Sequence, residues 1–131
     1  MTRSARTLLL HCLTAFLLVL ALAGLLVAAF RPALVWYYLL IAWLLAVNLV
    51  TFAYYAFDKS RARAVPPGDR IPEVILHGLA ALGGSPGAYM GMAVLRHKTV
   101  KLAFRFVFWM TVVFQVLLVA ALAYRILKGS D

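Results

Sequence analysis

The sequence predicts an all-α integral membrane protein with three spanning helices plus a broken or re-entrant helical hairpin, all in one domain, 1–131. Of its 131 residues, 66% are hydrophobic and 13% are charged, whereas soluble domains average about 45–50% apolar and about 25% charged residues. Three stretches, at about 8–30, 33–57 and 106–124, contain no Asp, Glu, Lys or Arg. Each is long enough to cross a hydrocarbon core of ~30 Å at ~1.5 Å per residue.

The first apolar stretch, 8–30, follows Arg3 and Arg6. It exceeds the ~7–15 apolar residues of a secretory signal, so we expect a retained helix. The second stretch, 33–57, has aromatic residues at both ends, which is typical of the two membrane interfaces. Asn48 lies near its middle and predicts an interhelical hydrogen bond.

Segment 71–95 is apolar but interrupted by the sequence GGSPG at 83–87. Pro72 is expected at the first position of one helix, and Ser85 is expected to cap a second helix with Pro86 at its first position. Each half-helix would have about ten residues and a length of ~15 Å, so neither spans the core alone. The two halves either cross together as a broken helix or enter and return.

The distribution of charge along the chain favours a segment 71–95 that enters the membrane and returns to the same side. The chain carries 13 Lys and Arg against 4 Asp and Glu, a net charge of +9. With the N-terminus in the cytoplasm and the segment re-entering, loops 58–70 and 96–105 are both cytoplasmic. Ten basic residues are then inside and three outside, against eight and five if the segment crosses. Cytoplasmic loops carry the excess of Lys and Arg, so the sequence favours a re-entrant helix.

The candidate site consists of polar residues near the cytoplasmic membrane interface. Glu73 and His77 are four residues apart and share a helical face, as do His97 and Lys101. They are either a binding site or a salt-bridge cluster that holds the hairpin, because charges near lipid need partners or water. The candidates for contact with a substrate or a lipid headgroup are Asp58, Lys59, Arg70, Glu73, His77, Arg96, His97, Lys98 and Lys101.

The backbone turn at Gly83, Gly84, Ser85 and Gly87 is a second candidate. Its N–H groups could bind an anion at a helix N-terminus. Alternatively, its small residues allow close helix packing. We expect no metal, because the spacing of Glu73, His77 and His97 matches no zinc signature. We also expect no cofactor.

Four motifs carry a family resemblance: Y-x-x-x-D-K, R-I-P-E, G-G-x-P-G-A and R-H-K-T, within the sequences YYAFDKSRA, RIPEVILHGLAALGGSPGA and RHKTVKLAF. The chain resembles a small bacterial inner-membrane family of unknown function, some of whose members carry an N-terminal cold-shock domain. The resemblance implies a multi-pass protein of the bacterial inner membrane. No cold-shock pattern precedes Leu8, so the nucleic-acid role of fused members does not extend to this chain.

Two functions remain open, and the sequence does not decide whether the protein is an enzyme. The first is a non-enzymatic membrane module whose basic cytoplasmic face binds anionic lipid or a partner protein. The alternative is a small membrane enzyme or transporter acting on a lipid or anionic substrate through Glu73, His77, Arg96 and His97. Expected partners are anionic membrane lipid and either a further copy of the chain or another membrane protein. Nucleic acid is not expected, because the basic residues flank apolar runs.

Overall fold

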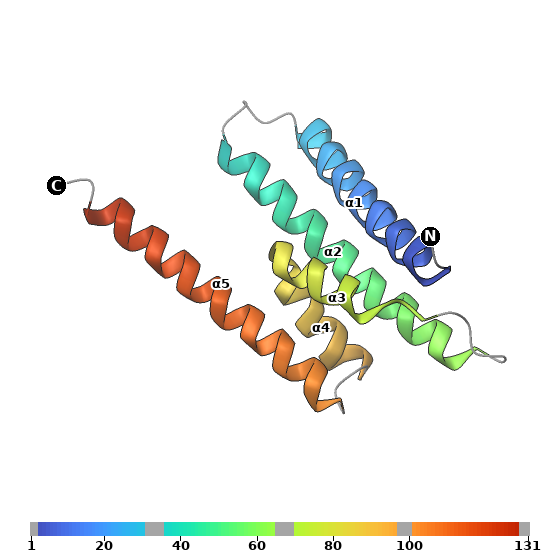
Figure 1. Cartoon of the computed structure of the whole chain (residues 1–131). Coiled ribbons are helices and arrows are strands. Elements are labelled where there is room, and N and C mark those ends of the chain that lie inside the picture. The colour runs from blue at the N-terminus through green and yellow to red at the C-terminus, as the bar shows by residue number, and fades with distance from the viewer. Residues whose placement is uncertain (1–2, 31–35, 65–69, 97–100, 129–131) are drawn as a thin grey trace.

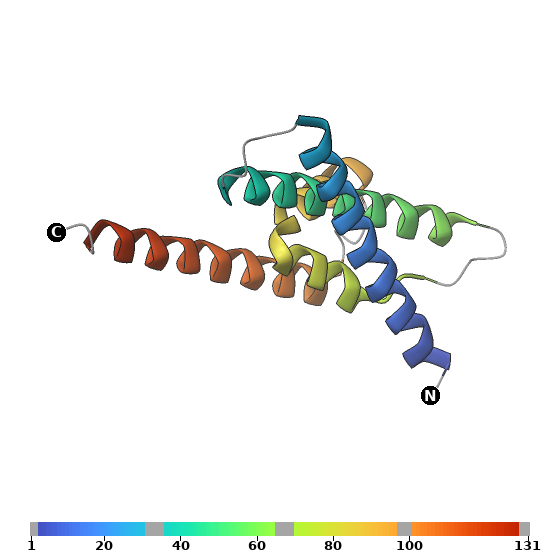
Figure 2. The same cartoon turned by 90° about the horizontal axis from the view of Figure 1, so that it is seen from above.

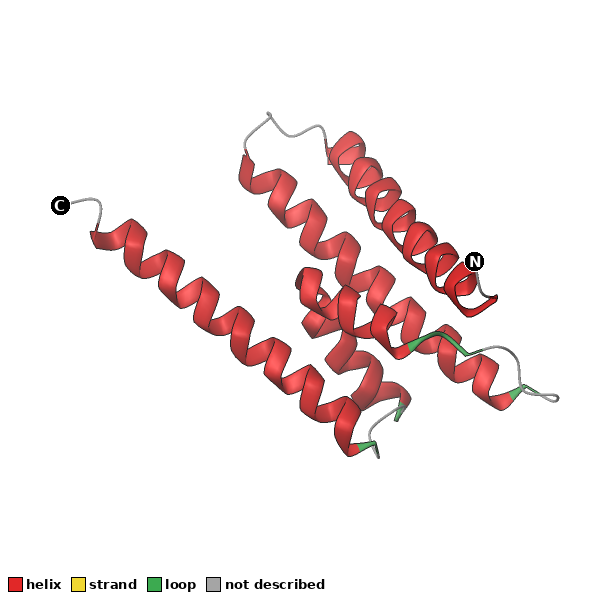
Figure 3. Ribbon diagram, viewed as in Figure 1, coloured by secondary structure: helices red, strands yellow, loops and turns green. Residues whose placement is uncertain are grey.

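The computed structural model describes residues 3–30, 36–64, 70–96 and 101–128. All regular structure within these ranges is helical, which confirms the all-α prediction (Figure 3). Three helices are long and apolar enough to cross a membrane, over Arg6–Ala29, Tyr38–Arg63 and Leu102–Arg125. In chain order the elements are α1 (Arg3–Phe30), α2 (Trp36–Arg63), α3 (Glu73–Leu79), the π-helical turn η1 (Ala80–Gly84), α4 (Ser85–Leu95) and α5 (Leu102–Lys128) (Figure 1).

Several boundaries differ from those expected. The sequence predicts a polar loop over 58–70, but α2 continues through residues 58–63 and ends at Arg63. No proline or glycine interrupts the sequence before Pro66, so nothing stops the helix earlier. Similarly, α5 begins at Leu102 and includes residues that were assigned to the loop 96–105. Pro72 precedes the first helical residue, with φ −57° and ψ 133°, instead of occupying the first helical position.

Helices α1 and α2 form an antiparallel pair. The Thr14 hydroxyl lies 3.0 Å from the Tyr54 hydroxyl, so the N-terminal half of α1 faces the C-terminal half of α2. Ala15 and Val19 are buried on the inner face of α1. In Figure 1 the start of α1 points towards the same end of the molecule as the final turns of α2, whereas Figure 2 shows that the two helices diverge at this end.

Helices α3 and α4 form a hairpin between α2 and α5. At the entry, the Ile71 amide donates to the Asp58 carboxylate (2.9 Å) near the end of α2. Towards the turn, the Trp43 indole donates to the Leu82 carbonyl (3.1 Å), so α3 runs antiparallel to α2. In the second arm of the hairpin, Gly91 packs against Tyr55, and α4 runs parallel to α2. Both arms consequently open at the C-terminal end of α2 (Figures 1 and 2).

Helix α5 begins at this same end and passes the turn of the hairpin. Lys101 pairs with Glu73 at the entry of α3, whereas Gln115 contacts Ala80 at the turn. Phe104 and Phe108 are buried against the hairpin. Residues 116–125 are exposed, and this half of α5 extends away from the other helices (Figure 2). A long exposed apolar surface of this kind fits contact with lipid.

Candidate functional site

The hairpin turns at Gly83, where the helix is interrupted. Gly83 has φ 108°, a conformation that glycine adopts without steric cost and other residues rarely adopt. At this π-helical turn the carbonyls of residues 80–83 accept hydrogen bonds from side chains of the neighbouring helices. In an apolar surrounding such groups must be satisfied within the protein.

Gln115 of α5 satisfies two of these carbonyls. Its Nε2 donates to Ala80 O (2.9 Å) and Ala81 O (3.0 Å). Ser85 Oγ lies 2.6 Å from Gln115 Oε1 and 3.0 Å from Ala80 O. Ser85 is therefore not the predicted N-cap. It is already helical, Gly84 occupies the cap position, and the Ser85 hydroxyl faces back towards the turn.

Two residues of α2 satisfy the other two carbonyls. Trp43 Nε1 donates to Leu82 O (3.1 Å), and Asn48 Nδ2 donates to Gly83 O (3.0 Å). Asn48 Oδ1 also accepts the Gly87 amide (2.6 Å), one of the unpaired donors at the start of α4. The interhelical hydrogen bond expected of Asn48 is thus present twice.

The glycines of η1 and α4 bring the backbone of this stretch against α2. A Cβ at Gly84 would collide with the Thr51 hydroxyl, and a Cβ at Gly87 would collide with the backbone of Asn48. At Gly91 it would lie 2.7 Å from the Tyr55 Cβ. These contacts, with the Gly87 amide already engaged, support close packing as the role of the turn, as small residues provide between membrane helices.

The predicted polar residues form a cluster at the open end of the hairpin. Lys101, the residue before α5, has its Nζ 2.9 and 3.0 Å from the two Glu73 carboxylate oxygens and so links the start of α5 to the start of α3. Glu73 is also in the first turn of α3, where the helix dipole favours negative charge. Asp58 is fully buried and accepts the Ile71 amide, joining α2 to the chain before α3. A salt bridge and a hydrogen bond thus link the elements at the entry of the hairpin.

Two aromatic residues that the sequence analysis did not select complete this cluster. The ring of Phe104 stacks on His77 with 4.2 Å between centroids and meets Tyr55 edge-on at 6.2 Å. Tyr55 is fully buried, and its hydroxyl has no hydrogen-bond partner within the described residues. Tyr55 and Asp58 are three residues apart on one helical face, so this spacing could have identified Tyr55.

Three further predicted residues, Lys59, Arg96 and Arg70, lie in α2, after α4 and ahead of α3. Lys59 lines a shallow pocket of about 400 Å³ with Ser60, Arg63 and Leu95. Arg96 follows Leu95 at the end of α4, with a left-handed φ of 47°, and Arg70 is exposed ahead of α3. His97 and Lys98 lie outside the described residues. Among the residues that the structure describes, no three His, Cys, Asp or Glu side chains could together hold a metal ion.

The fold defines a helical membrane protein with three long apolar helices and an internally capped hairpin. Residues 48–104 match a protein family described as Protein of unknown function (DUF1294). The match extends from the middle of α2 to the start of α5 and therefore includes the hairpin and its polar cluster. No curated protein and no solved structure matches the chain. Helix α1 and most of α5 lie outside the matched range.

Proposed function

We propose that the protein is a non-enzymatic membrane module whose basic face binds anionic lipid or a partner protein, and that this face is cytoplasmic in the bacterial inner membrane. The observation that carries the proposal is the gathering of basic side chains at the open end of the hairpin. In the described side chains this end carries Arg6, Lys59, Arg61, Arg63, Arg70, Arg96, Lys101 and Arg105, and the other end carries Arg125 and Lys128.

The hairpin geometry supports this proposal. Because α3 and α4 both open at the end of α2, Arg70 ahead of α3 and Arg96 after α4 lie at the same end of the helices. We therefore take the hairpin as re-entrant from that face, in agreement with the excess of Lys and Arg on cytoplasmic loops. The paired arms would enter and leave the same leaflet.

Electrostatics favour lipid as the first occupant. Each Lys or Arg near an anionic membrane surface contributes about 1 kcal/mol of attraction. At this end the described carboxylates are Asp58, which is buried, and Glu73, which pairs with Lys101. The basic face therefore has few acidic side chains that compete with phosphate.

Spin-labelled lipids in reconstituted bilayers test the proposal. The lipids in contact with the protein should be enriched in phosphatidylglycerol relative to phosphatidylcholine. The combined Arg63→Gln, Arg70→Gln and Arg105→Gln substitutions should lower the ratio of the two association constants towards 1. The matched control replaces the same three residues with Lys, which keeps the charge. Wild-type selectivity in the Gln variant would reject lipid binding by this face.

A second candidate is a small membrane enzyme or transporter that acts on a lipid or anionic substrate through Glu73, His77, Arg96 and His97. It is favoured by the buried Tyr55 hydroxyl, since polar groups inside a membrane protein often mark functional sites. Native mass spectrometry of the purified protein tests it. A retained small molecule that is lost in His77→Ala, with the fold intact, supports the candidate, whereas an empty wild-type protein opposes it.

A further inference from the structure

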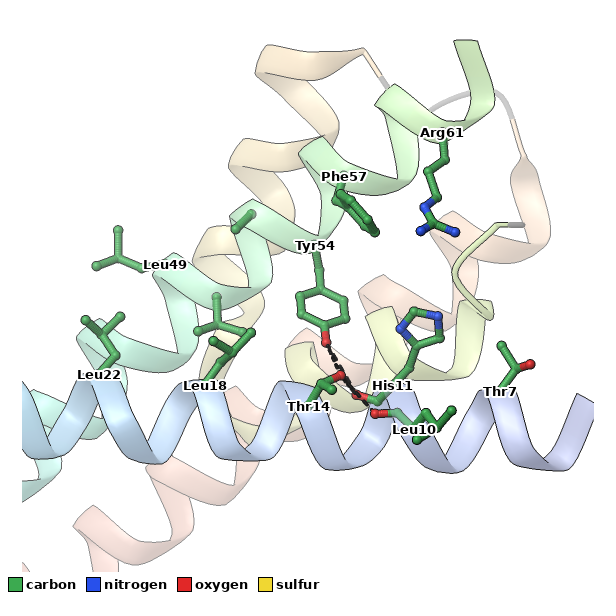
Figure 4. Close-up of a pocket in the computed structure, with 12 residues that line it drawn as sticks. Thr7, Leu10, His11, Thr14, Leu18, Leu22, Leu49, Tyr54, Phe57 and Arg61 are labelled. Carbon is green, nitrogen blue, oxygen red and sulfur yellow. Dashed lines mark hydrogen bonds between the residues drawn. The ribbon is translucent and has the colours of Figure 1, made fainter. Parts of the chain in front are cut away.

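A groove of about 780 Å³ runs between α1 and α2 and involves no residue of the hairpin (Figure 4). Its volume is within the ~300–1,000 Å³ typical of small-molecule sites. One end is lined by aliphatic side chains, among them Leu18 and Leu22 of α1 and Leu49 of α2. The other end is lined by Thr7 and His11 of α1 and by Arg61 of α2. The groove is therefore amphipathic along its length.

A permanent positive charge is positioned at the polar end. The Arg61 guanidinium carbon lies 4.7 Å from the centre of the Phe57 ring, a cation–π contact that orients the side chain along α2. Figure 4 shows Arg61 on the same side of α2 as His11 and Thr7 of α1. No Asp or Glu is among the side chains that line the groove in the described part of the chain. Arg61 gives this end of the groove a positive charge, which is complementary to an anion.

The middle of the groove has little polar capacity left. The Tyr54 hydroxyl lies 3.0 Å from Thr14 Oγ1 and 3.4 Å from the His11 carbonyl oxygen. Thr14 Oγ1 also lies 2.9 Å from the Leu10 carbonyl oxygen. These contacts join the two helices across the floor of the groove (Figure 4). An occupant therefore meets mainly hydrocarbon between the polar end and the leucines.

The length of the groove matches one leaflet. Leu49 and Arg61 are twelve residues apart on α2, which corresponds to about 18 Å along the helix. Half of a hydrocarbon core of ~30 Å is about 15 Å, so a ligand with its charge at Arg61 would reach Leu49 near the bilayer centre. A lipid has these proportions, whereas a free phosphate or a soluble peptide does not.

We propose that the groove between α1 and α2 binds one anionic phospholipid, with its phosphate at Arg61 and an acyl chain along Leu18, Leu22 and Leu49. The inference rests on the proposed function for the leaflet and for the sign of the lipid charge. It adds a discrete site with a fixed stoichiometry. This site lies almost entirely outside the polar cluster and uses α1, which the family match does not cover.

Native mass spectrometry in detergent, with phosphatidylglycerol or phosphatidylcholine added, tests the site. The wild-type protein should retain one phosphatidylglycerol in preference to phosphatidylcholine. Loss of a hydrogen bond to a charged group predicts that Arg61→Gln weakens retention about tenfold. Arg61→Lys should keep most of it, and Arg125→Gln, in the last turn of α5 and outside both the groove and the basic face, should keep all of it.

Filling the apolar end provides an independent variant. Leu18→Trp should displace the acyl chain and abolish the single retained lipid, whereas Leu17→Trp, on an exposed position outside the groove, should not. Equal retention of both lipids, or unchanged retention in Arg61→Gln and Leu18→Trp, would overturn the inference. Leu18→Trp keeps every charge, so the spin-label selectivity of the basic face should survive it. The proposal for the groove and the proposal for the basic face can therefore be refuted independently.

Discussion

Replacing Gly87 with Ala should destabilise the protein, because it places a methyl group where α4 touches α2. The added Cβ would collide with the backbone oxygen of Asn48. Backbone cannot rotate aside as a side chain can, so the two helices would have to separate or tilt. The same backbone contact brings the Gly87 amide to Asn48 Oδ1, and separation would also lengthen that hydrogen bond.

Gly78→Ala is the matched control. A Cβ at Gly78, in α3, would have no atom within 4 Å. Both variants gain the intrinsic helical preference of Ala over Gly, about 1 kcal/mol. Overpacking a tight contact costs about 1–3 kcal/mol. The difference in unfolding free energy between the two variants should therefore be about 1–3 kcal/mol, with Gly78→Ala the more stable.

Titration with a denaturing detergent measures this difference. Tryptophan fluorescence is a suitable signal, because Trp43 donates to the turn of the hairpin and should respond when the hairpin leaves α2. Equal unfolding midpoints for Gly87→Ala and Gly78→Ala would refute the reasoning. That result would mean that α4 does not approach α2 as closely as the glycines allow.

Three further predictions concern the cap and the open end of the hairpin. Asn48→Leu removes the partners of one carbonyl and one amide at the turn and should lower the unfolding free energy by about 1–3 kcal/mol in the same titration; a neutral effect would mean that the turn is satisfied without it. Asp58→Ala should cost about 1–3 kcal/mol, because it leaves a buried amide unpaired, and Glu73→Ala at most about 1 kcal/mol, because its ion pair is exposed; the reverse order would contradict this assignment. In a cysteine-free background, Ser60→Cys and Arg96→Cys should react with an impermeant thiol reagent from one side of the membrane; labelling from opposite sides would exclude a re-entrant hairpin.

The composition of the sequence and the lengths of its uncharged apolar stretches were sufficient to predict the all-α fold and the three long helices. These features depend on local hydrophobicity, which a single sequence contains in full. The break near Gly83 was also predictable, because the run of Gly and Pro cannot continue a helix. The predicted ends of the helices were less accurate. Residues 58–63 are mostly polar, but because they contain no Gly or Pro, α2 continues through them beyond its apolar part.

The partners within the site could be predicted only in part. The Glu73 and Lys101 pair was expected among several charges, but its specific geometry depends on how α5 packs against α3. The role of Trp43 as a donor to the turn had no local signal, since its partner is 39 residues away. Ser85 was assigned as a cap from its position before Pro86. In the structure, contact with Gln115 of α5 determines its role.

The cap of the hairpin also has a consequence for the order in which the chain assembles. Trp43 and Asn48 precede the hairpin in the chain, so both donors are present in α2 when the turn is synthesised. Gln115 follows it by about thirty residues, and until α5 arrives the Ala80 and Ala81 carbonyls lack their amide donor. We therefore expect biogenesis in two stages, in which α1 and α2 insert first and the hairpin settles only when α5 closes over it. A nascent chain truncated before α5 should accordingly expose its hairpin to proteolysis or quality control.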